Sequence, residues 1–233
     1  LSERRIDQSV RRVLKLKWQR GIISDPLVDE SAVATTVGTR EHLAEAQRIT
    51  DRSVTVLRDD AGLLPLASAP AKVLVAGWHN PANAGAPAEP VAALANSLTA
   101  RGSAVTALPS PAAPTEEQIS AAVAAAADND VVIVITNNLG GNVAQRTLLE
   151  RLLATGKPVV AVAAQVPYDA GFVEAPTWIA TYSWRDVSME SLAKVLLGEI
   201  APQGKLPVDV PTGDDPATVR YPFDTGMPVR GSA

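Results

Sequence analysis

Polar and aromatic side chains gather in three short segments, each of which follows an apolar run. The segments are GWHN at residues 77–80, NNLGGN at 137–142 and QVPYD at 165–169. Their amide, phenol and carboxylate groups donate and accept hydrogen bonds, as binding of a hydroxyl-rich ligand requires. The Gly-Gly pair is also placed to open a helix, where free backbone N–H groups bind a phosphate or a hydroxyl. The segments predict either a polar ligand site or ordinary turns.

Four side chains in the second and third segments are the candidate ligand contacts. They are Asn137, Asn138, Tyr168 and Asp169, with Asp169 as the carboxylate best suited to hydroxyl groups. Each follows a predicted strand, and in open α/β sheets the ligand crevice lies beyond the carboxyl ends of the strands. Stabilisation of turns within the domain is the alternative role for all four.

Other catalytic constellations lack support in the sequence. There is no G-x-G-x-x-G or G-x-x-x-x-G-K-[ST] motif for a nucleotide, and no G-x-S-x-G element for a serine nucleophile. His42 and His79 are far apart and cysteine is absent, which argues against a zinc site or a thiol nucleophile. The sequence therefore indicates no metal and no cofactor. Retaining glycoside hydrolysis needs two carboxylates, or a substitute for one of them, about 5 Å apart. The 25 acidic residues make such a pair possible, but the sequence alone does not identify it.

Charge and hydropathy exclude several classes of partner. The 233 residues include 21 basic and 25 acidic ones, and the net charge of −4 favours neither nucleic acid nor an anionic membrane. No apolar run approaches the roughly 20 residues that span a bilayer. The first ten residues, LSERRIDQSV, lack the apolar core of a signal peptide. We expect a globular protein without a membrane span, and the compartment, extracellular or cytoplasmic, stays open.

The first 66 residues are predicted to be a lead-in to a larger domain. Apolar residues recur every three or four positions from Ser2 to Arg20, which predicts an amphipathic helix that Gly21 ends. We interpret its basic face as solvated or paired with acidic neighbours rather than as a phosphate site. A polar connector leads to Thr39, the predicted N-cap of a second helix. A strand and a turn are expected over 54–62.

From Lys72 onward, short apolar runs alternate with alanine- and leucine-rich stretches. Continuous hydrophobicity is typical of strands buried on both faces, which predicts a mostly parallel sheet between two helical layers. The expected strands are KVLVAGW, SAVTALP, DVVIVITNN, KPVVAVAAQ and TWIATYS. Residues 204–211, GKLPVDVP, are expected as a sixth strand at an edge, because proline cannot donate to a ladder. The predicted fold is a three-layer α/β sandwich, with a linker-like loop at 80–90.

Five segments occur in the order and at the spacing typical of glycoside hydrolase family 3. They are RIDQSVRRVLKLKWQRGI, AQRITDRSVTVLRDDAGLLPL, DVVIVITNN with Gln145 and Leu148 in the following helix, GKPVVAVAAQVPYD, and LGEIAPQGKLPVDVP. The chain resembles this family over nearly its whole length, and most of all the bacterial β-N-acetylhexosaminidase branch. The last segment is similar to the family's G-x-x-x-P-x-G-K-L-P pattern, which runs here from Gly198 to Pro207.

The resemblance implies that the chain has three parts. Residues 1–20 resemble the terminal helix of the family's (β/α)8 barrel, residues 21–66 its linker, helix and lead-in strand, and residues 67–233 its C-terminal α/β sandwich. The implied partners are the protein's own N-terminal barrel domain and a carbohydrate substrate at the domain boundary. The implied activity of the parent enzyme is retaining hydrolysis of terminal β-linked N-acetylglucosamine.

The family's catalytic residues have no counterparts in this sequence. In the hexosaminidase branch the aspartate nucleophile and the His-Asp acid/base pair lie on the barrel. Residues 24–27, SDPL, are superficially similar to the family's S-D-x-L segment, but Asp25 follows the terminal helix and is expected to be an exposed turn residue. The β-glucosidase branch uses a glutamate of the sandwich domain. The segments match that branch less well, so neither Glu174 nor Glu190 is nominated, and the chain alone is expected to be inactive.

Two further interpretations come from other functional classes. The chain would be a stand-alone carbohydrate-binding or interaction module if it had no catalytic partner. It would be a flavodoxin-like nucleotide-binding domain if it showed measurable affinity for a nucleotide or a flavin.

Overall fold

The computed structural model describes residues 1–66, 72–80 and 89–228. The linker-like loop expected at 80–90 therefore lies mostly outside the described residues. The chain divides into two compact units, Leu1–Leu43 and Ala44–Ala233. The boundary falls inside helix α3 (Arg40–Ser53), and each unit is described by itself. The three-part division at residues 20 and 66 stays a prediction.

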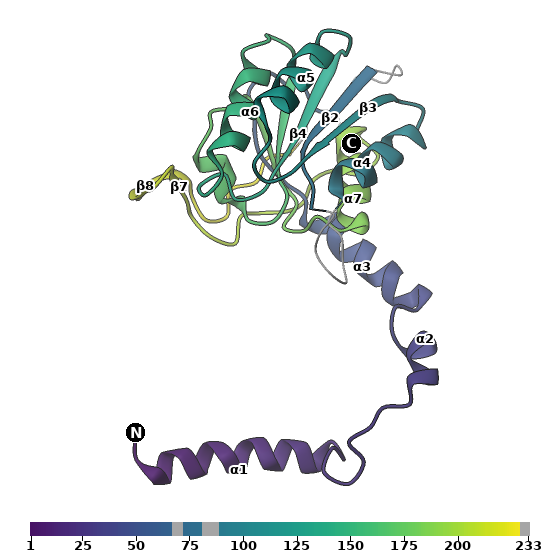
Figure 1. Ribbon diagram of the computed structural model, residues 1–233, viewed down its shortest axis with the longest axis vertical. Helices are drawn as coiled ribbons and strands as arrows, with labels where there is room; N and C mark the ends of the chain where they lie inside the picture. Colours follow the sequence, from purple (N-terminus) through teal and green to yellow (C-terminus); the bar gives the residue numbers. More distant parts are fainter. Residues whose placement is uncertain (67–71, 81–88, 229–233) are drawn as a thin grey trace. The chain divides into compact units, whose positions relative to one another are not determined.

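The first unit is mainly helical. It contains α1 (Glu3–Gln19), the 3-10 turn η1 (Glu30–Ala32), α2 (Val33–Thr36) and the start of α3 (Figure 1). α1 forms where the apolar spacing predicts it, and none of its residues is buried. The hydroxyl of Thr39 accepts a hydrogen bond from the His42 N–H at 3.3 Å, as the predicted N-cap requires. Asp25 is exposed and directly follows the turn at 21–24.

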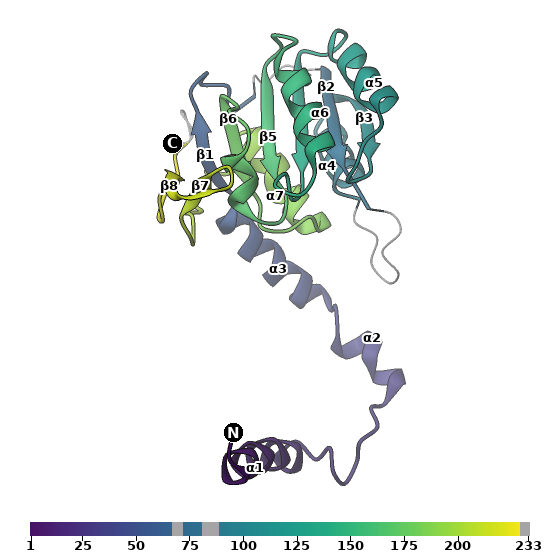
Figure 2. The same ribbon diagram turned by 60° about the vertical axis from the view of Figure 1, so that its left-hand side comes forward.

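A six-stranded sheet forms the centre of the second unit (Figure 2). Its strands are β1 (Thr55–Asp59), β2 (Lys72–Trp78), β3 (Ala104–Ser110), β4 (Val131–Thr136), β5 (Val159–Ala163) and β6 (Thr177–Ala180). The spatial order is β1-β6-β5-β4-β2-β3, and every neighbouring pair is parallel except β1 with β6. The run VVIVIT of β4 is buried throughout, as a parallel sheet with two covered faces requires.

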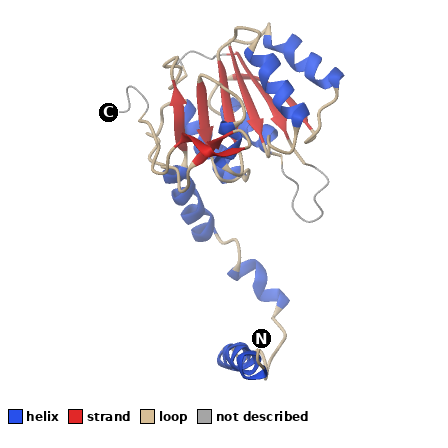
Figure 3. Cartoon of the chain, turned by 90° about the vertical axis from the view of Figure 1, so that its left-hand side faces the viewer, coloured by secondary structure: helices blue, strands red, loops and turns tan. Residues whose placement is uncertain are grey.

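Helices cover both faces of this sheet (Figure 3). They are α4 (Pro90–Thr99), α5 (Glu116–Ala126), α6 (Val143–Leu153) and α7 (Asp186–Leu196). Leu74 and Val132 share a core with α5 and α6, whereas Val73 and Ile133 share the other core with α4 and α7. Adjacent strand residues thus point to opposite faces, as the strand pleat dictates. The predicted three-layer α/β sandwich is confirmed.

The sheet edge corrects one prediction. GKLPVDVP is not the sixth strand, because that place belongs to β1, whose residues the sequence predicts only as a lead-in strand. Residues 204–209 have no strand structure, and the Gly204 N–H donates to Val54 O at 3.1 Å. An ideal Cβ on Gly204 would lie 2.1 Å from Ser53 O, so this approach to the end of β1 requires glycine. The motif therefore borders β1 instead of extending the sheet.

A short hairpin follows this segment. It consists of β7 (Val210–Thr212) and β8 (Asp215–Tyr221), and it is joined to the 3-10 turn η2 (Pro167–Gly171). The Gly213 N–H donates to Gly171 O at 2.8 Å. An ideal Cβ on Gly171 would lie 2.1 Å from Pro211 O. The absence of a side chain at residue 171 thus lets the hairpin lie against the segment that follows β5.

Candidate functional site

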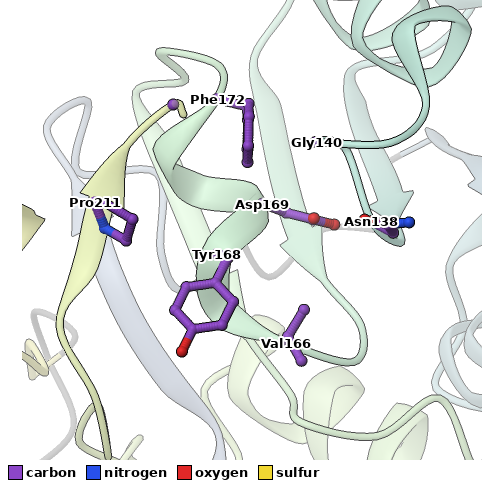
Figure 4. Close-up of a pocket in the computed structure, with 8 residues that line it drawn as sticks. Asn138, Gly140, Val166, Tyr168, Asp169, Phe172 and Pro211 are labelled. Carbon is purple, nitrogen blue, oxygen red and sulfur yellow. The ribbon is translucent and has the colours of Figure 1, made fainter. Parts of the chain in front are cut away.

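A surface pocket of about 320 Å³ opens beyond the carboxyl ends of β4 and β5 (Figure 4). Three segments form it: the loop after β4, the segment around η2, and the β7–β8 hairpin. The lining residues are Asn138, Gly140, Val166, Tyr168, Asp169, Phe172, Pro211 and Gly213. This is the edge of the sheet where an open α/β fold binds its ligand.

The Gln145 side chain holds the loop after β4 through hydrogen bonds to both the backbone N–H and the backbone carbonyl of Asn137. The Asn137 N–H donates to Oε1 of Gln145 at 3.1 Å, and Nε2 of Gln145 donates to Asn137 O at 3.0 Å. Leu139 is fully buried and anchors the next turn. Between them Asn138 adopts φ = 60°, a left-handed conformation that asparagine tolerates better than most residues. The exposed Asn138 carboxamide therefore stands on a fixed backbone at the pocket.

Asp169 connects η2 to this loop. Its side chain points toward the Asn138 and Gly140 segment (Figure 4) and the residue is only 2% exposed. Oδ1 accepts from the Leu139 N–H at 2.8 Å, and Oδ2 accepts from the Thr136 hydroxyl at 2.7 Å. Burial raises the pKa of the Asp169 carboxyl, and these hydrogen bonds oppose the rise. Each carboxylate oxygen thus has a protein partner, which is the arrangement that the turn-stabilising alternative predicts.

The apolar part of the pocket centres on Phe172. Its ring lies so close to Gly140 that an ideal Cβ there would be 2.8 Å from Cζ of the ring. The guanidinium carbon of Arg146, on α6, lies 5.3 Å from the ring centroid, within cation–π range. Tyr168 is 41% exposed, and its phenol group has no hydrogen-bond partner among the residues that the structure describes. Pro211 faces this region from the hairpin (Figure 4).

The structure brings together three of the four predicted contacts. Asn138, Tyr168 and Asp169 line the pocket, whereas Asn137 does not. Sequence reasoning missed Phe172 and Pro211. The only available signal was Gly171, whose need to be glycine depends on a contact 40 residues away in sequence, with Pro211. The roles of all four predicted residues stay predictions.

The segment 77–80 takes a different place in the fold. Trp78 is buried, and its ring lies 5.6 Å from that of Trp184 with the two planes at 79°. Neither tryptophan lines the pocket. The His79 N–H donates to Ser110 O at 2.9 Å, which continues the pairing of β2 with β3. This segment therefore lies at the same carboxyl edge of the sheet, after the strand next to β4, but it takes part in packing and in strand pairing instead of lining the pocket.

Within residues 1–66, 72–80 and 89–228, no three histidine or acidic side chains are placed to hold a metal ion. None of the helices in these ranges is both long enough and apolar enough to cross a bilayer.

The sequence model of the glycosyl hydrolase family 3 C-terminal domain matches residues 54–229. The chain belongs to this family. The matched range includes the whole sheet, the pocket and the β7–β8 hairpin. The family assignment therefore rests on the same residues that build the candidate site.

Solved structures of two other glycosidases share this fold. A β-N-acetylglucosaminidase from Paenibacillus sp. is 29% identical, with a TM-score of 0.73 over 88% of this chain and 39% of its own. A β-glucosidase from Erythrobacter marinus is 22% identical, with the same TM-score of 0.73 over 98% of this chain and 40% of its own. At the lower identity the likeness concerns the fold alone.

Curated relatives carry other names. β-Glucosidase C of Emericella nidulans is 25% identical over 98% of this chain. A protein of Formosa agariphila with a provisional β-xylosidase name is 28% identical over 90% of this chain. The chain spans only 35% and 31% of the lengths of these two relatives. The chain thus corresponds to about one third of the length of each relative.

Proposed function

We propose that this chain is the C-terminal domain of a family 3 glycosidase that hydrolyses terminal β-linked N-acetylglucosamine. The mechanism is retaining, with a covalent glycosyl-enzyme intermediate. The nucleophile and the acid/base pair lie on a (β/α)8 barrel domain that residues 1–233 do not contain. The sandwich packs on that barrel and its pocket borders the substrate.

The observation that carries this proposal is that the Asp169 carboxylate at the pocket is already hydrogen-bonded by the protein. Among the described lining residues Asp169 is the only acid, and both its oxygens accept hydrogen bonds from the protein. A general acid must reach the glycosidic oxygen of the substrate, and Asp169 is 2% exposed. This arrangement fits the branch in which the barrel supplies every catalytic group.

The positions of two glutamates of the sandwich, Glu190 and Glu174, also support this proposal. Glu190 is paired with Arg101 at 2.6 Å, on the α4–α7 side of the sheet. Glu174 is solvent-exposed, with Arg58 3.9 Å away. Neither lines the pocket. The likeness to the Paenibacillus β-N-acetylglucosaminidase, at 29% identity, supports the same branch.

Asn138 and Tyr168 are the proposed sugar contacts. Their carboxamide and phenol groups are exposed at the pocket and offer both donors and acceptors to sugar hydroxyls. Asn137 and Asp169 complete the predicted set. Asp169 holds the loop that carries Asn138, and its remaining lone pairs are the part available to a hydroxyl group.

A β-glucosidase or β-xylosidase activity is the second candidate. The names of the curated relatives, β-glucosidase C among them, favour it. Terminal glucose carries a hydroxyl group in place of the acetamido group, and terminal xylose lacks the hydroxymethyl group as well. A comparison of substrates therefore separates them.

The test is hydrolysis of three aryl β-glycosides, those of N-acetylglucosamine, glucose and xylose. Each is incubated with this chain and with the same chain preceded by its native upstream region. We expect activity only in the longer protein, and mainly on the N-acetylglucosaminide. Preference for the glucoside or xyloside would replace the substrate assignment. Activity of the 233-residue chain alone would overturn the placement of the chemistry on a barrel.

A matched pair of variants tests the role of Asp169 in the longer protein. Asp169→Asn keeps the shape of the side chain. Its Oδ1 accepts from the Leu139 N–H, and its Nδ2 donates to the Thr136 hydroxyl, which in turn donates to Val162 O. If Asp169 only holds the loop, Asp169→Asn retains kcat/KM and Asp169→Ala loses it. Equal losses in both variants would assign the carboxylate charge itself to substrate binding.

A further inference from the structure

Phe172 is held in place from two sides. The packing of its ring on Gly140 excludes even a methyl group between them. Arg146 lies over the ring, and its Nε is buried without a hydrogen-bond partner among the described residues. Its Nη2 donates to Gly140 O only at 3.5 Å, the limit of a hydrogen bond. The aromatic ring is therefore the main close partner of this cation, and Arg146 fixes the ring in the pocket wall.

The remaining wall is mostly unable to form hydrogen bonds. The side chains of Val166, Phe172 and Pro211 are apolar, and they face the same pocket (Figure 4). A sugar hydroxyl placed against them would lose water without gaining a partner. A methyl group placed there gains by leaving water. The Asn138 carboxamide, on the same pocket, offers one donor group and one acceptor group.

An acetamido substituent matches both features at once. It carries a methyl group, an amide N–H donor and a carbonyl acceptor, whereas a hydroxyl substituent carries no apolar part. We propose that Phe172 is a specificity-determining residue that contacts the methyl group of an N-acetylated sugar, with Asn138 paired to the amide and Arg146 as the positioning residue of the ring. This inference rests on the proposed function and names the part of the sugar that the pocket recognises.

Saturation-transfer difference NMR on the 233-residue chain tests this without any variant. The probes are the methyl β-glycosides of N-acetylglucosamine, glucosamine and glucose. We expect the acetyl methyl protons to receive the strongest saturation, and the acetylated sugar to bind about fourfold more tightly than the glucoside for one buried methyl group. Equal binding of all three sugars, or stronger saturation of ring protons than of the methyl, would overturn the inference.

Variants then assign the effect to Phe172 and Arg146. Phe172→Ala is expected to abolish the preference for the acetylated sugar. Phe223→Ala is the matched control, because Phe223 is the only other phenylalanine, is 65% exposed and does not line the pocket. Arg146→Met is expected to lower the preference and Arg146→Lys to restore part of it. An unchanged preference in Phe172→Ala would refute the assignment, and the wild-type experiment stands if that variant does not fold.

The two proposals fail in different ways. If the longer protein hydrolyses the N-acetylglucosaminide but the acetyl methyl receives no saturation from this chain, the contact to Phe172 is wrong and the proposed function stands. If the methyl is saturated but the longer protein prefers the glucoside, the pocket recognises an acetamido group and the hydrolysed sugar is a different one.

Discussion

Helices α1 and α7 share one kind of sequence pattern and differ in what covers them. Both repeat apolar residues at helical spacing, and both form helices. In α7 seven residues are buried, Leu192 and Met189 among them, whereas in α1 none is. The periodicity thus predicts the helix in each case, but burial depends on whether a second element faces the apolar side.

The largest effect is expected where the backbones of two strands meet. Gly77 of β2 has φ = 116°, and an ideal Cβ on it would lie 2.1 Å from Ile135 O of the paired strand β4. Gly77→Ala should lower the free energy of unfolding by about 2–6 kcal/mol, because backbone strain and overpacking combine. Urea unfolding followed by circular dichroism measures it.

Gly21→Ala is the control for that substitution in the first unit. Gly21 also has a positive φ, 75°, but an added Cβ would meet nothing within 4 Å. The unfolding midpoint of the sandwich should therefore not change. A loss below about 1 kcal/mol in Gly77→Ala would show that the two strands can separate far more easily than their contact indicates.

Truncation of a leucine compares the two helices directly. Leu192 of α7 is 0% exposed and Leu14 of α1 is 50% exposed. Leu192→Ala should cost about 3 kcal/mol through lost burial and a residual cavity. Leu14→Ala should change the same unfolding transition by less than about 0.5 kcal/mol. Similar costs in the two variants would mean that the apolar face of α1 is buried in solution.

The local sequence predicts much of the sandwich. The parts that it does not predict share one cause, a dependence on contacts between residues far apart in sequence. Fully buried runs such as VVIVIT predict their strands because no other element of this length excludes polar residues on both faces. The composition of GKLPVDVP predicts a strand at the edge of the sheet. Its true place depends on the contact of Gly204 with Ser53, about 150 residues away in sequence.

The candidate site likewise contains residues that the local sequence predicts and residues that it does not. Asn138 and Tyr168 are recognisable because they follow predicted strands. Phe172 and Pro211 line the same pocket because Gly171 lets the hairpin approach, and this tertiary contact has no local signal in the sequence. The burial of Asp169 is equally invisible in sequence, since an aspartate after a strand is usually exposed.

Asp169→Ala should have an intermediate effect on stability. It removes the acceptor of the Leu139 N–H, and an unpaired buried donor costs about 1–3 kcal/mol. Asp169→Asn retains that acceptor and should unfold close to the wild type at neutral pH. Thermal unfolding of both variants measures the difference. A loss in Asp169→Asn as large as in Asp169→Ala would show that the carboxylate charge, and not its geometry, holds the loop.

The pH dependence of stability should separate Asp169 from Asp29 of the first unit. Burial raises the pKa of Asp169 above its ordinary value of 3.8. Its contribution is therefore fully present below pH 3.8 and is lost as the pH rises through the folded-state pKa. Hydrogen bonds from the Ser31 hydroxyl and the Ser31 N–H lower the pKa of Asp29 below 3.8. That contribution is present above pH 3.8 and is lost as the pH falls.

Carboxyl 13C shifts recorded across a pH titration check these two directions. Asp169→Asn should also remove the loss of sandwich stability that begins above pH 3.8. If Asp169 titrated below Asp29, the hydrogen bonds from Leu139 and Thr136 would outweigh its burial.

Removal of residues 1–20 should have the smallest effect on the sandwich. Because α1 buries no side chain, the truncated chain should retain the unfolding free energy of the second unit to within about 0.5 kcal/mol. Its association should change more, since the apolar stripe of α1, which includes Ile6, Val10 and Trp18, is exposed. We expect a larger monomer fraction by analytical ultracentrifugation. A destabilised sandwich would show that α1 packs on it. Unchanged association would show that the apolar stripe of α1 does not drive self-association.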